Sequence, residues 1–161
     1  MWRGMAESYG SIGNYDKALA ALANSTAVEP GNVVSWFSAG VYLQRLGRFG
    51  DAQTYFDKAL EIDPAYKDAL YGKGLSMLAL GKPSEALKLY DSALALDAKY
   101  KLAYNAKGMA LESEGKYLEA LNAYNQALQV DPNYGEAMNN KVHVLLALKR
   151  YDEAMKQYMS L

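Results

Sequence analysis

The chain has no cysteine and only one histidine, His143. Without cysteine it can form neither a disulfide framework nor a thiolate metal site. His143 has no second metal ligand one helical turn away, because Asn139 and Ala147 stand there. No serine occupies the Gly-x-Ser-x-Gly setting of a nucleophile elbow. We therefore expect a protein that is not an enzyme, holds no metal and needs no cofactor.

An excess of charge of one sign is also missing, since 17 basic side chains stand against 18 acidic ones and the formal net charge is −1. Nucleic-acid binding requires a basic surface that neutralises phosphates. No apolar run reaches the length of about 18 residues that spans a bilayer. Residues 1–9 lack the apolar stretch of a signal peptide. We expect a soluble, cytoplasmic protein that binds neither nucleic acid nor membrane.

What the sequence does contain is a period of 34 residues. Five alanines recur at this spacing: Ala18, Ala52, Ala86, Ala120 and Ala154. Four residues after each alanine stands a large side chain: Leu22, Phe56, Tyr90, Tyr124 and Tyr158. At a fixed distance before the last four alanines stand Gly40, Gly74, Gly108 and Val142. A fixed period with the same chemistry at fixed offsets indicates a solenoid of stacked helix pairs.

Within each period the apolar residues follow helical spacing. Trp36, Gly40 and Leu43, for example, share one face of a helix that Gly47 ends. Helices are predicted over residues 34–46, 51–62, 68–80, 84–96, 102–114, 118–130 and 151–161. Small residues such as Gly40 and Ala52 are expected where paired helices approach closely. Large side chains are expected beside that contact: Trp36, Leu70, Tyr104, Phe56, Tyr90 and Tyr124. No stretch shows the period of two that strands require, so the predicted fold class is all-α.

This pattern resembles the tetratricopeptide repeat, whose signature is W-x2-L-G-x2-Y, then A-x3-F, then P, on a period of 34. The second repeat shows it best, in Trp36, Gly40, Phe49, Ala52, Phe56, Ala59 and Pro64. The resemblance covers five repeats, at about 1–32, 33–66, 67–100, 101–134 and 135–161. It implies a right-handed α-solenoid of antiparallel helix pairs, in a single array over residues 1–161 with no second domain.

The resemblance also implies a function, because in this family the first helix of each pair lines a concave groove that binds peptides. The groove residues carried over to this chain are Val34, Phe37, Val41, Gln44, Asp68, Tyr71, Leu75, Leu78, Leu102, Asn105, Met109, Glu112, Asn139 and His143. Phe37, Tyr71, Leu75 and Met109 would be apolar anchors. Asn105, Asn139 and Gln44 would orient the ligand. The competing interpretation is that neighbouring first helices bury these side chains.

The leading hypothesis is therefore a non-catalytic protein–protein interaction scaffold whose partner is a protein or peptide. Two ligand modes of the family do not fit its residues. Members that clamp a C-terminal carboxylate carry lysines where this chain has acidic Asp68 or Glu136. Members with an asparagine ladder repeat asparagine at a site where this chain has only Asn140.

A second periodic feature is a lysine before the glycine position in the last three repeats. These lysines are Lys73, Lys107 and Lys141, where the family pattern has leucine. They could form a stripe that binds an anion or acidic partner. The simpler interpretation is that their methylenes cover the helix pair and their ammonium groups reach solvent.

The last predicted helix, 151–161, would be the second helix of a repeat with no helix after it. Met155, Tyr158 and Met159 would lie on its stacking face. Either the chain is part of a longer array, or copies assemble end to end as homo-oligomers through this face. The alternative functions are thus a self-assembling module and a substrate-docking segment of a larger enzyme.

Overall fold

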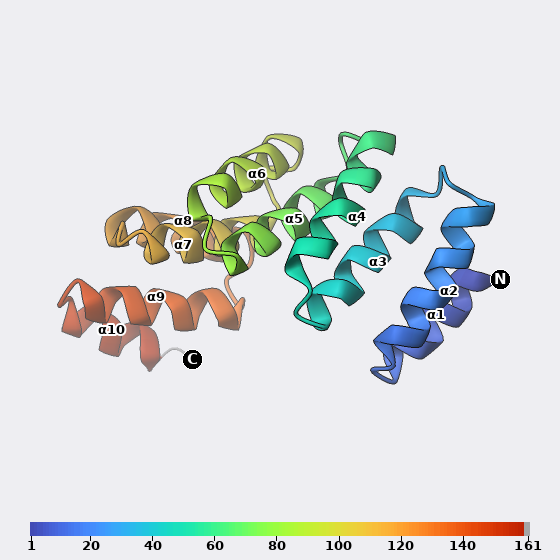
Figure 1. Ribbon diagram of the computed structural model, residues 1–161. Helices are drawn as coiled ribbons and strands as arrows, with labels where there is room; N and C mark the ends of the chain where they lie inside the picture. The colour runs from blue at the N-terminus through green and yellow to red at the C-terminus, as the bar shows by residue number, and fades with distance from the viewer. Residues whose placement is uncertain (160–161) are drawn as a thin grey trace. The chain divides into compact units, whose positions relative to one another are not determined.

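The computed structural model describes residues 1–159, and every regular element within them is an α-helix (Figure 1). The helices are α1 (Trp2–Ser11), α2 (Tyr15–Val28), α3 (Val33–Arg45), α4 (Phe49–Ile62), α5 (Lys67–Ala79), α6 (Pro83–Leu96), α7 (Lys101–Ser113), α8 (Tyr117–Val130), α9 (Gly135–Ala147) and α10 (Tyr151–Tyr158). The predicted all-α class is confirmed. Residues 160–161, the end of the predicted helix 151–161, lie outside the described part of the chain.

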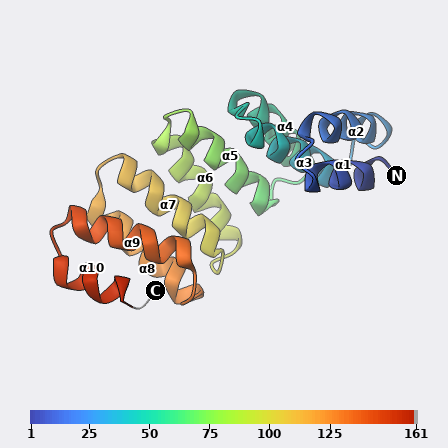
Figure 2. The same ribbon diagram turned by 90° about the horizontal axis from the view of Figure 1, so that it is seen from below.

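The chain divides into two compact units, Met1–Gly81 and Lys82–Leu161. In the first unit each of the helices α1 to α5 packs against the next, and α3 also contacts α5. In the second unit α6 to α10 do the same, and α7 also contacts α9. Consecutive helices within each unit run side by side in alternating directions (Figure 2). The division falls between the two helices of the third repeat, and the single array stays a prediction.

Helix ends follow the chemistry of the sequence. Gly13, Gly47, Gly81 and Gly115 follow the first helices of four repeats with φ between +72° and +74°, a conformation that favours glycine. The fifth repeat has Lys149 at the same place, with φ of 59°. Helix α6 begins at Pro83, one residue before the predicted start at residue 84, because proline is well suited to the first turn.

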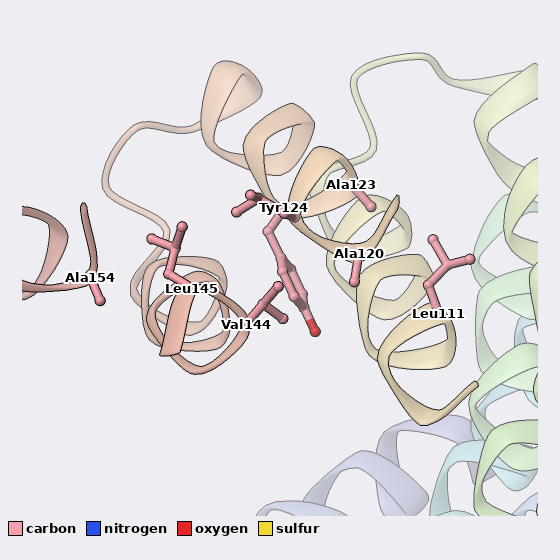
Figure 3. Close-up of a cluster of buried hydrophobic side chains, with 8 residues drawn as sticks. Leu111, Ala120, Ala123, Tyr124, Val144, Leu145 and Ala154 are labelled. Carbon is pink, nitrogen blue, oxygen red and sulfur yellow. The ribbon is translucent and has the colours of Figure 1, made fainter. Parts of the chain in front are cut away.

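The core repeats the small-and-large pairing expected from the sequence. Ala52, Ala86 and Ala120 are fully buried, and so are Phe56, Tyr90 and Tyr124. In Figure 3 the Tyr124 ring of α8 reaches toward Val144 of α9, and both belong to one apolar cluster. Trp36, Leu70 and Tyr104, the other expected large side chains, are only half-buried.

Two of these half-buried aromatic side chains hydrogen-bond to the loop that precedes their own helix. Trp36 donates from Nε1 to the Pro30 carbonyl oxygen at 2.8 Å, and the Tyr104 hydroxyl donates to that of Ala98 at 3.3 Å. Pro30 and Ala98 occupy the same place in their repeats. Both side chains therefore satisfy a loop carbonyl. Trp36 also packs against Tyr55 of the paired helix α4, with ring centroids 5.8 Å apart, as the sequence predicted.

Close helix approach explains the periodic glycine. A Cβ added to Gly40 would lie 2.6 Å from Cε1 of Phe56, and one added to Gly108 would lie 2.4 Å from Cε1 of Tyr124. No real Cβ contact is that short. The aromatic ring of the second helix thus packs directly on the backbone of the first, and any larger residue would displace it.

Candidate functional site

The first unit contains a cavity of roughly 420 Å³ between α3 and α5. Its walls are mostly apolar, and the lining residues are Phe37, Val41, Gln44, Arg45, Phe49, Tyr71, Gly72 and Leu75. Five of the predicted groove residues are brought together here: Phe37, Val41, Gln44, Tyr71 and Leu75. The remaining predicted residues of this unit, Val34, Asp68 and Leu78, are half-buried on the same helices outside the lining.

The aromatic wall of this cavity is anchored in the core beneath it. The Phe37 ring lies 6.0 Å from that of Phe56 and meets Tyr66 edge-on at 5.3 Å between centroids. Phe37 and Val41 both pack against the buried cluster around Phe56. Burial and the nearby carboxylates of Asp68 and Asp63 raise the pKa of the Tyr66 phenol, so this hydroxyl stays protonated. The Phe37 side of the wall is therefore packed on the core through Phe56 and Tyr66.

Gln44 and Arg45 both line the cavity, but only the Gln44 side chain hydrogen-bonds to other residues of the unit. Gln44 donates from Nε2 to the Gly72 carbonyl oxygen at 2.7 Å and to Ser76 Oγ at 2.9 Å, which ties α3 to α5. Arg45 is exposed at the rim. Its guanidinium forms no hydrogen bond or ion pair with any residue in the described part of the chain. Its charge is therefore available to a ligand.

Phe49 and Gly72 line the cavity but were not among the predicted residues. Gly72 matters because its backbone lies against the Phe56 ring, where an added Cβ would be 2.8 Å from Cζ. The sequence does indicate this close approach, because the same place in the first four repeats is always a small residue: Gly4, Ser38, Gly72 and Ala106. A run of small residues at one place predicts a close approach of helices.

The second unit uses its predicted polar groove residues to join helices. Asn105 is buried, and its Oδ1 accepts a hydrogen bond from Nδ2 of Asn140 at 3.0 Å, which links α7 to α9. Glu112 accepts one from the Tyr124 hydroxyl at 2.9 Å. Burial, reinforced by that carboxylate, raises the pKa of the Tyr124 phenol well above its usual range.

The other predicted residues of this unit face outward to different degrees. Met109, Asn139 and His143 are exposed, and Leu102 is half-buried. No group of three or more histidine, cysteine, aspartate or glutamate side chains that could hold a metal ion occurs among the residues described.

Two of the three periodic lysines bind carboxylates of the preceding repeat. Lys73 Nζ lies 2.5 Å from Asp57 Oδ1, and Lys107 Nζ lies 2.6 Å from Asp91 Oδ1. Asn125 stands where Lys141 would find the third aspartate. Lys73 and Lys107 therefore fasten neighbouring helix pairs together. Their ammonium groups end on a carboxylate, not in open solvent as the simpler interpretation expected.

A second apolar surface lies on α9 and α10. The side chains that line its cavity of roughly 320 Å³ are Val142, Leu146, Tyr151, Ala154, Met155 and Tyr158. Met155, Tyr158 and Met159, the predicted assembly face, are 65%, 69% and 81% exposed. We call these residues of α9 and α10, with Met159, the terminal face. Within residues 1–159, no helix is long and apolar enough to cross a bilayer.

Models of the tetratricopeptide repeat match the chain over residues 37–101 and 111–161. Among solved structures, the chain is similar to MamA from Desulfovibrio magneticus RS-1, at 21% identity over 99% of this chain and 90% of that one, with a TM-score of 0.87. It is also similar to YrrB, described as a repeat protein with an unusual peptide-binding site, at 22% identity over 97% and 80% of the chains and a TM-score of 0.73. The first repeat domain of RPAP3 (Spaghetti), bound to the HSP90 peptide SRMEEVD, matches at 25% identity over 73% and 93%, with a TM-score of 0.70. A search of curated protein sequences found no match.

Proposed function

Since the chain belongs to the tetratricopeptide repeat family, we propose that it is a protein–protein interaction scaffold that binds a peptide segment of a partner. The cavity between α3 and α5 is the anchor point of that peptide. The observation that supports this assignment is the cavity itself, of roughly 420 Å³ with mostly apolar walls. The proposal assigns no catalytic role to the chain.

The apolar walls argue for an apolar side chain as the anchor. Phe37, Val41, Tyr71 and Leu75 are each half-buried, so they keep surface that packing within the unit does not use. Covering such surface removes it from water and supplies most of the affinity of small interfaces. A Leu, Met or Phe side chain of the peptide fits a cavity of this size.

The rim argues for an acidic residue beside that anchor. Arg45 carries the positive charge at the rim and has no internal partner among the described residues. A guanidinium binds a carboxylate with two parallel hydrogen bonds, which fixes orientation as well as adding affinity. We therefore expect ligands in which an apolar residue is followed or preceded by aspartate or glutamate.

The descriptions of two similar proteins support a peptide ligand but not a particular sequence. YrrB is described as having a peptide-binding site, and the RPAP3 domain binds an HSP90 peptide. The carboxylate clamp is not proposed for this chain, because acidic Asp68 and Glu136 stand where clamp members have lysine. The anchor cavity, rather than a clamp on the peptide terminus, is the proposed determinant.

The test is a selection of short random peptides on the full chain, followed by affinity measurement on variants. Enriched peptides should share an apolar residue next to an acidic one. Tyr71→Glu places a charge in the apolar wall, so we expect it to weaken binding of those peptides by about tenfold or more. Arg45→Glu should weaken only peptides that carry the acidic residue.

Tyr117→Glu is the matched control, because Tyr117 is an exposed tyrosine in the first turn of α8, where a carboxylate is well tolerated. It should bind the selected peptides as the original chain does. Far-ultraviolet circular dichroism establishes that each variant keeps its helix content. Undiminished binding by a folded Tyr71→Glu variant would remove the cavity from the proposed function.

A further inference from the structure

Two of the junctions between successive repeats, α4 with α5 and α6 with α7, follow one rule of pairing. A residue on the second helix of one repeat faces the residue sixteen places later on the first helix of the next, as Asp57 faces Lys73 and Asp91 faces Lys107. Phe56 meets Gly72 in the same register, one residue earlier. The junction of α4 with α5 therefore combines an aromatic ring on a small residue with a neighbouring polar pair.

Helix α10 presents the first half of such a junction. Tyr158 and Met159 occupy the places of Phe56 and Asp57, three periods of 34 residues later. Phe56 is fully buried by the following helix, whereas Tyr158 is 69% exposed and Met159 is 81% exposed. The ring and its neighbour thus form a stacking surface that nothing covers within residues 1–159.

Val142 keeps the Tyr158 ring on that surface. The corresponding Gly108 leaves room for the Tyr124 ring against its own backbone, where a Cβ would lie 2.4 Å from the ring. Val142 carries such a Cβ, so Tyr158 cannot pack down in the same way. The aromatic side chain instead borders the apolar cavity of the terminal face.

Helix α1 presents the second half of the junction. Gly4 and Met5 occupy the places of Gly72 and Lys73, two periods earlier. A Cβ added to Gly4 would meet nothing within 4 Å, and Met5 is 39% exposed, so this side of α1 is open. A small residue is present for an aromatic ring to pack on, as Gly72 is for Phe56.

The two ends also match each other in chemistry. Where the chain pairs Asp57 with Lys73, the terminal places hold Met159 and Met5. Replacing only one partner would bury an unpaired charge, whereas replacing both leaves an apolar pair. Met5 and Met159 are both apolar, so a junction between them would leave no charge without a partner.

We propose that α1 of a second copy of this chain stacks on α10, head to tail. Gly4 of the second copy covers Tyr158, and its Met5 contacts Met159. The contact is heterologous, because it joins two different surfaces, so it leaves a free α1 at one end and a free α10 at the other. It uses neither the cavity between α3 and α5 nor any residue proposed there.

Sedimentation velocity over a concentration series of the full chain tests this assembly. For the chain without substitutions, the average mass of the species in solution should rise with concentration. Met159→Asp and Met5→Lys each set a charge against a methionine, so each alone should weaken association by about tenfold or more. An equal mixture of the two variants should associate again, because every contact then pairs Asp with Lys or Met with Met.

Asn122→Asp is the matched control, since Asn122 is exposed on α8 and the change adds the same charge away from both ends. It should leave association unchanged, as should Tyr71→Glu. The proposal is overturned if the original chain is monomeric at all concentrations. It is equally overturned if Met5→Lys associates normally, as in a tail-to-tail dimer, or if the mixture of helical variants stays monomeric.

Discussion

Glycine inside a helix costs about 1 kcal/mol of stability relative to alanine, so each helical glycine needs a reason. Gly108 has one, because the Tyr124 ring occupies the place of its missing Cβ. Gly50, in the first turn of α4, has none, since a Cβ there would meet nothing within 4 Å. The two residues share a type and a helical setting but differ in what surrounds them.

This difference predicts opposite effects of the same substitution. Gly108→Ala should destabilise the chain by about 1–2 kcal/mol, because the overpacking exceeds the gain in helix propensity. Gly50→Ala should stabilise it by roughly 0.5–1 kcal/mol. Urea denaturation of both variants measures the sign. Stabilisation by Gly108→Ala would show that the Tyr124 ring moves aside without loss.

At the scale of the element, the helix pairs are joined by an apolar contact with an ion pair at its edge. The side chains of Lys73 and Asp57 are 22% and 48% exposed, so water screens much of their attraction. The ion pair therefore contributes less than the burial of Phe56 beside it. Its role is better described as fixing the register of one helix pair on the next.

The missing third pair gives a prediction at this scale. Asn125→Asp places a carboxylate on α8 opposite Lys141 of α9, as Asp91 stands opposite Lys107. We expect a gain of about 0.5 kcal/mol in the free energy of unfolding, lost at high salt. The same substitution in a Lys141→Met background should give no gain. An equal gain there would mean that the new carboxylate acts through another group.

For the whole molecule, buried phenols link stability to alkaline pH. Burial is the main cause that raises the pKa of Tyr42 and Tyr66 in the first unit and of Tyr124 in the second. In the unfolded chain a tyrosine loses its proton near pH 10. The folded chain keeps these protons to higher pH, so above about pH 10 the unfolded state binds fewer protons and stability falls as pH rises.

Tyr124→Phe tests this dependence. A phenylalanine ring should be tolerated at position 124, because Phe56 occupies the same place in the second repeat. At neutral pH the variant should lose about 1 kcal/mol with the hydrogen bond to Glu112. Above about pH 10 its stability should fall less steeply than that of the original chain. Urea midpoints measured from pH 7 to pH 11 check both expectations, and parallel pH profiles would contradict the assignment.

The fold was predictable because most of its information is local and repeated. Helix ends at Gly47 and Gly115 and the Ala52–Phe56 spacing each depend on residues within one turn or one loop. Five copies of the same pattern then remove the ambiguity that a single copy would have. The cavity was predictable only in part. Phe37 and Tyr71 stand at the same place in successive repeats, so the repeat pattern identifies them. Gly72 lines the cavity because its backbone packs against Phe56 of a neighbouring helix, which the pattern does not specify.

The sequence by itself therefore determined the all-α class, the period, the bounds of α3 to α8 to within two residues, and the small and large residues that meet within a pair. Only the tertiary structure decided which polar residues join helices. Asn105 lies 35 residues from Asn140, and Lys73 lies 16 residues from Asp57, so neither partner follows from local spacing. Their partners depend on how one helix pair packs on the next. The same packing explains why Tyr158 is exposed while its repeat equivalents are buried.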